Sequence, residues 1–113
     1  GESLRILHRL LDQGESPQLL MGGIGWQVRK MLQVRRAMAS GIPGPRACTD
    51  AGIRWKQTEF ARRVSRADLA TLQACHDRLL ETDLELKTSG SAAEEALLET
   101  LVLRLASALA PVR

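Results

Sequence analysis

The chain has 113 residues, of which 44% are hydrophobic but only 3% aromatic, and its formal net charge is +3. This length suits one compact domain with a core of aliphatic side chains. There is no signal peptide and no apolar run of the roughly 18 residues that a membrane span needs, so we expect a soluble cytoplasmic protein with no membrane partner. The two cysteines, Cys48 and Cys75, match no metal-binding spacing and imply no disulfide framework.

The basic residues are concentrated in the middle of the chain. Residues 29–66 include ten Lys or Arg against two acids, whereas the rest of the chain has six against eleven. This asymmetry favours an acidic partner for the middle segment. A solvated basic face is the alternative interpretation.

Apolar residues at helical spacing predict helices from the first residues onward. The first helix ends at Gly14 and has four residues on one side: Leu4, Leu7, His8 and Leu11. Ser16 as N-cap and Pro17 at the first helical position predict the start of a second helix. Its apolar side consists of Leu20, Ile24, Val28, Met31, Val34 and Met38.

The glycines and prolines of segment 41–45 predict a break, followed by a short helix over 46–51 that ends at Gly52. Another helix is predicted over 54–64. Its core side consists of Phe60, Ala61 and Val64.

The longest helix is predicted over 65–90, from a capping-box-like pair, Ser65 and Asp68, to Gly90. Its apolar stripe consists of Leu69, Leu72, Cys75, Leu79, Leu80, Leu84 and Leu86, and three polar residues fall within it: His76, Asp83 and Lys87. Asp83 and Lys87 are four residues apart, a spacing at which an ion pair forms on a helix. This pair is either structural or turned towards another subunit.

A second capping box, Ser91 and Glu94, predicts a last helix that runs to about Leu109. Leucines cover much of its circumference, which indicates burial by neighbouring helices or by another subunit. No segment has the alternation of a strand. The predicted fold is therefore all-α, a compact bundle of about five to six helices.

No group of residues has the pattern of a catalytic or cofactor site. Gly23 and Gly25 lack the third glycine of a dinucleotide fingerprint, because Val28 stands there, and Lys30 is not followed by Ser or Thr as in a phosphate-binding loop. His8 and His76 lie at helical spacing with leucines, as core or boundary histidines do. We expect a non-enzymatic domain without a cofactor or metal.

Trp55 is the residue whose position best suits nucleic acid. It lies off the predicted apolar face, between Arg54 and Lys56, and on a side shared with Arg62 and Arg66. Bases stack on aromatic rings and arginines neutralise phosphates. The alternative is a tryptophan partly buried under a neighbouring helix.

Trp26, next to Arg29 and Lys30, is a weaker candidate for nucleic acid. Protein contact or internal packing is the favoured interpretation there.

The order of the segments resembles the C-terminal domain of the delta subunit of bacterial DNA polymerase III, a clamp-loader subunit, over nearly the whole chain. The resemblance rests on LLDQGESP at 10–17, a helix carrying Gln27, Arg29 and Val34-Arg35, GIRWK at 52–56, and DLELKTSG at 83–90, where Asp-x-x-aliphatic-Lys ends a long helix.

The resemblance implies an all-helical collar domain spanning residues 1–113, one part of a longer subunit. In the family, five such modules form a ring that holds delta, delta-prime and three ATPase subunits together. Delta itself does not hydrolyse ATP, and it opens the sliding clamp through an N-terminal domain that lies outside these residues. The resemblance also implies that the residue at the Trp55 position can lie near the template strand as DNA leaves the chamber. Two features depart from the family pattern: Thr88 in place of an aromatic after Lys87, and the poorly basic Thr58-Glu59.

A stand-alone DNA-binding domain is the alternative, with a helix-turn-helix over 45–64. Gln57 is the one side chain near the start of its second helix that is suited to reading bases.

Overall fold

The computed structural model describes residues 2–90 and 93–109, and within these ranges the chain forms six α-helices and no strand. This confirms the predicted all-α bundle. The helices are α1 (Glu2–Asp12), α2 (Pro17–Ala39), α3 (Gly44–Asp50), α4 (Gln57–Ser65), α5 (Leu69–Thr88) and α6 (Glu94–Ala108). None of these helices has both the length and the apolar character needed to cross a membrane.

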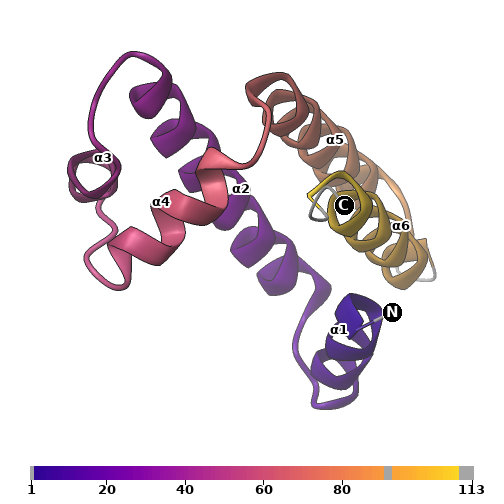
Figure 1. Ribbon diagram of the computed structural model, residues 1–113. Coiled ribbons are helices and arrows are strands. Elements are labelled where there is room, and N and C mark those ends of the chain that lie inside the picture. Colours follow the sequence, from indigo (N-terminus) through magenta and orange to yellow (C-terminus); the bar gives the residue numbers. More distant parts are fainter. Residues whose placement is uncertain (1, 91–92, 110–113) are drawn as a thin grey trace.

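The helix α2 runs through the middle of the molecule and contacts most of the others (Figure 1). α5 and α6 lie side by side along it, and α1 packs against α6 near the N-terminal end of α2. The short helices α3 and α4 pack on each other and on the C-terminal half of α2. α2 therefore connects two ends of the molecule that have different partners.

The buried side chains form two hydrophobic clusters along α2. The first joins α1, α2, α5 and α6 through Leu7, Met21, Val28, Cys75, Leu79, Leu86, Leu98, Leu101 and Leu105. The second joins α2, α3, α4 and the start of α5 through Leu32, Val34, Ala47, Cys48, Ala51, Ile53, Ala61, Val64 and Leu72. The buried members of both clusters are aliphatic residues, one methionine and two cysteines, as the low aromatic content predicts.

The predicted start of α2 is confirmed. Ser16 has extended backbone angles, and its hydroxyl accepts a hydrogen bond of 3.0 Å from the backbone N–H of Leu19. Pro17 occupies the first helical position, where the missing N–H costs nothing.

The predicted start of the longest helix at Ser65 is wrong. Ser65 is the last residue of α4, and its hydroxyl donates to the carbonyl of Arg62 at 2.7 Å. The N-cap of α5 is Asp68, with extended backbone angles. Arg35 of α2 donates to the carbonyl of Ala67 at 2.9 Å, so a distant helix holds the break between α4 and α5.

The buried stripe of α5 is narrower than predicted. Leu80 and Leu84 are 54% and 64% exposed, because they lie beside the seam that meets α2 and α6 rather than on it. Thr82 occupies the seam instead, and its hydroxyl donates to the carbonyl of Arg78 at 3.0 Å. This local bond satisfies a buried hydroxyl without a partner on another helix.

In α6, Leu98, Leu101 and Leu105 are buried against neighbouring helices, whereas Leu103 is 50% exposed. Neighbouring helices therefore bury one side of α6, whereas the side that carries Leu103 is exposed. α6 begins at Glu94, and the other half of the predicted capping box, Ser91, lies outside the described residues.

Candidate nucleic-acid and subunit interfaces

Trp55 lies in the turn between α3 and α4, not in a helix as predicted. α4 begins only at Gln57, because Lys56 has a left-handed backbone with φ of 51° that a helix cannot include. Gly52 at the other end of the turn has φ of +84°, a conformation that glycine adopts without strain. The predicted helix over 54–64 is therefore shorter at its start, and the turn projects the Trp55 side chain, which is 77% exposed.

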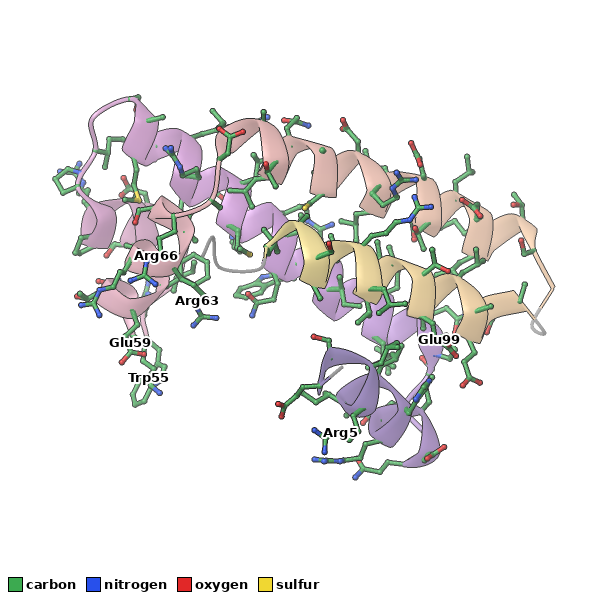
Figure 2. The ribbon with its side chains drawn as sticks, turned by 45° about the vertical axis from the view of Figure 1, so that its right-hand side comes forward. Arg5, Trp55, Glu59, Arg63, Arg66 and Glu99 are labelled. Carbon is green, nitrogen blue, oxygen red and sulfur yellow. The ribbon has the colours of Figure 1, made fainter. Side chains whose placement is uncertain are left out.

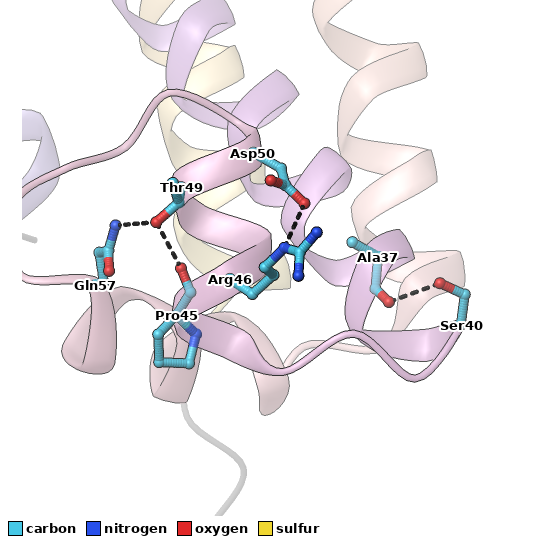
Figure 3. Close-up of polar contacts among 7 residues, drawn as sticks. All are labelled: Ala37, Ser40, Pro45, Arg46, Thr49, Asp50 and Gln57. Carbon is cyan, nitrogen blue, oxygen red and sulfur yellow. Dashed lines mark hydrogen bonds and ion pairs between the residues drawn. The ribbon is translucent and has the colours of Figure 1, made fainter.

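Polar contacts hold this turn on both sides. The side-chain amide of Gln57 donates to the carbonyl of Ile53 at 2.7 Å. It also donates to the hydroxyl of Thr49 at 2.8 Å (Figure 3). Lys30 of α2 donates to the carbonyl of Ala51 at 2.6 Å. With the side chain of Ile53 buried, the turn is anchored to α2, α3 and α4. Trp55 is thus an exposed aromatic side chain on a turn whose backbone is held by hydrogen bonds.

The same contacts bear on the helix-turn-helix alternative. Both N–H groups of the Gln57 side chain are engaged within the domain, by Ile53 and Thr49. An amide used in this way is not available to read a base edge. The one base-reading candidate of that interpretation therefore has a structural role here.

Basic side chains continue from Trp55 along α4. Figure 2 shows Glu59 and Arg63 of α4 together with Trp55, which precedes this helix, and Arg66, which follows it. Arg54, Lys56, Arg62 and Arg66, the residues predicted to accompany Trp55, are all exposed. Arg63 was not among the predicted contacts, although it is four residues from Glu59 and so shares its face. Glu59 brings one negative charge into this basic surface.

Most of the polar residues predicted to be structural or to face another subunit border two grooves between α2 and α5. Arg29, Asp83 and Lys87 line a groove of about 570 Å³ together with the exposed Leu80. Arg29 and His76 line a neighbouring groove of about 370 Å³, which also contains Arg36. Arg29 lines both grooves, so they lie next to each other, and we refer to the two together as the strip between α2 and α5.

Trp26 is not in the lining of either groove, and it is 46% exposed. The ammonium of Lys30 lies 5.8 Å from the centre of its ring, within the range of a cation–π contact. Since Lys30 also binds the carbonyl of Ala51, Trp26 is connected to the turn that carries Trp55. This arrangement fits internal packing as well as contact with a partner.

The predicted Asp83–Lys87 ion pair is present, with Nζ 2.8 Å from a carboxylate oxygen. The side chains of Asp83 and Lys87 are 42% and 71% exposed, so solvent screens the pair.

We expect Asp83→Ala to change the free energy of unfolding by less than about 1 kcal/mol, as measured by urea denaturation. A larger loss would show that Asp83 supports the fold.

The two thiols are poor candidates for covalent chemistry. Cys48 and Cys75 are buried, and burial raises the pKa of both thiols. The reactive thiolate is therefore disfavoured at neutral pH.

Comparison with known families identifies the chain. The family model described as "DNA polymerase III delta subunit, C-terminal domain" matches residues 1–105 of the 113. Searches of curated proteins and of solved structures found no match. The family match covers all of α1 to α5 and most of α6. The chain therefore belongs to the family formed by the C-terminal domains of DNA polymerase III delta subunits.

Proposed function

We propose that this domain holds a bacterial delta subunit in the clamp-loader assembly and presents the Trp55 turn to DNA. Residues 1–113 would be one helical collar domain of a longer cytoplasmic protein, packed beside delta-prime and the ATPase subunits. Domains outside these residues would contact the sliding clamp. The family membership supports the assembly role, because the delta subunit is a clamp-loader component.

The observation that carries the DNA contact is the position of Trp55. An indole that is 77% exposed has little packing within the domain, so it gives up few contacts when it stacks on a base. The hydrogen bonds around the turn fix its backbone, so binding costs little ordering entropy. Arg54 and Lys56 on either side would neutralise phosphates next to the stacked base.

The assembly role has support from the exposed leucines of α5. Leu80 and Leu84 are one helical turn apart and lie next to Asp83 and Lys87. Two exposed leucines beside charged groups form the kind of apolar centre with a polar rim that protein interfaces have. We infer that the strip between α2 and α5 contacts a neighbouring member of the loader.

A substitution of Trp55 tests the DNA contact. In the complete loader, Trp55→Ala is expected to weaken primer–template binding by about 1–3 kcal/mol, the contribution of one stacked base. Binding would be measured by fluorescence anisotropy at a fixed salt concentration, and assembly by gel filtration.

Two variants sharpen this test. Trp55→Phe keeps a ring for stacking and should retain most of the affinity. Arg54→Gln removes one of the proposed phosphate contacts and should reduce the salt dependence of binding, which Trp55→Ala should leave unchanged. Unaltered DNA binding by Trp55→Ala would remove this residue from the DNA surface.

A further inference from the structure

We propose that His8, Glu95 and Glu99 form a binding site for a divalent transition-metal ion, with Zn²⁺ the best fit, where α1 crosses α6. One ligand atom from each of the three side chains lies within 4.8 Å of the other two. His8 comes from α1 and both glutamates from α6, so the site joins helices that are distant in the sequence. It is separate from the proposed assembly and DNA surfaces.

The geometry of the three side chains suits a tetrahedral ion. Two ligands bound to one tetrahedral zinc at 2.0–2.1 Å lie about 3.4 Å apart. Nε2 of His8 is 3.3 Å from Oε1 of Glu99. Glu95 and Glu99 are four residues apart and so share one face of α6. Figure 2 shows Glu99 on the side of α6 that faces α1.

The three side chains of the proposed site can be reached from solvent. The side chains of His8 and Glu99 are 45% and 37% exposed, so an ion can enter from solvent and water can complete its coordination. Figure 2 shows Arg5 of the same helix extending away from α6. Among the described residues, neither carboxylate forms an ion pair with a Lys or Arg.

The donor set selects among metals. One imidazole nitrogen and two carboxylate oxygens are ligands that Zn²⁺ accepts, and three protein ligands leave one position for water. Mg²⁺ and Ca²⁺ prefer oxygen ligands alone, and Mg²⁺ retains much of its water. An imidazole in the set therefore favours zinc over these ions.

Among the described residues, the other soft zinc ligands are less accessible. Cys48 and Cys75 are buried, and burial raises the pKa of both thiols, which disfavours the thiolate that zinc requires. His76, the second of the two histidines, lines a groove with Arg29 and Arg36, whose charges repel a cation. His76 is thus a matched control for His8.

A metal ion bound by His8, Glu95 and Glu99 would link α1 to α6 and so stabilise the packing of α1 on the rest of the domain. Of the helices, α6 is the main partner of α1, through apolar contacts that include Leu7. An ion that binds only when both helices are in place stabilises the folded state. Zinc should therefore raise the melting temperature of the domain.

The test is a titration of the 113-residue chain, prepared without a histidine tag, with ZnCl₂. Calorimetry should give one Zn²⁺ per chain, thermal unfolding should shift upward with zinc, and MgCl₂ at the same concentration should cause no shift. His8→Gln and Glu99→Gln should each weaken zinc binding more than about tenfold, whereas His76→Gln should leave it unchanged.

A second measurement separates loss of the site from loss of the fold. The melting temperature of each variant without metal shows whether α1 still packs, and Co²⁺ absorption reports the ligands of the bound ion directly. A tetrahedral cobalt spectrum in the parent chain that disappears in a folded His8→Gln variant supports the site. Zinc affinity that is absent, or equal in the parent and His8→Gln, overturns the proposal.

Discussion

Replacing Leu72 with alanine is expected to lower the free energy of unfolding by about 2–5 kcal/mol. Leu72 is fully buried in the second hydrophobic cluster, where α5 meets α2 and α4. Truncation removes the transfer free energy of its side chain and leaves a cavity that α-helices anchored elsewhere cannot close. Urea denaturation followed by circular dichroism gives the change.

The control for Leu72 is another leucine of the same helix. Leu80→Ala removes the same atoms from a side chain that is 54% exposed. It should change the free energy of unfolding by less than about 0.5 kcal/mol. Equal losses at the two positions would contradict the narrow buried stripe assigned to α5.

Gly44→Ala is expected to destabilise the domain by about 1–3 kcal/mol. A Cβ atom at Gly44 would lie 2.6 Å from the Cβ of Ala61, so α3 and α4 would have to move apart. The test is the midpoint of urea denaturation. Ala61→Gly in the same chain should restore part of the loss, because it removes the other atom of the clash.

Gly22→Ala is the matched control for Gly44. Gly22 is inside α2, and apart from its chain neighbours and the backbone of this helix no atom lies within 4 Å of a Cβ placed there. Alanine there should stabilise the domain by up to about 1 kcal/mol, the difference in helix propensity. Opposite signs at the two glycines are the expected outcome. A Gly44→Ala variant as stable as the parent would contradict the packing of α3 on α4, and a loss at Gly22 would contradict the open space assigned to that position.

The class of the fold could be predicted from the sequence, but the starts of α4 and α5 could not. Ser16 and Ser65 are both good N-cap residues, yet only Ser16 caps a helix. What separates them is the bond from Arg35 to the carbonyl of Ala67, a contact between residues far apart in the chain. Local preferences contain no information about such a contact.

The geometry of the candidate sites also depends on contacts between distant residues, which the local sequence does not encode. Trp55 was predicted to be exposed on a helix, and its exposure is confirmed although it lies in a turn set by the left-handed Lys56. A positive φ at a lysine has no sequence signal, because the surrounding packing imposes it. His8 and Glu99 are 91 residues apart, so only the folding of α1 onto α6 brings them together.

The central claim is that this bundle assembles with other clamp-loader subunits. The most direct measurement is gel filtration of the 113-residue domain mixed with delta-prime and the ATPase subunits, in the absence of DNA. Co-elution in one complex is the predicted result. Elution of the domain by itself, together with tight sequence-dependent DNA binding by the lone domain, would contradict the claim.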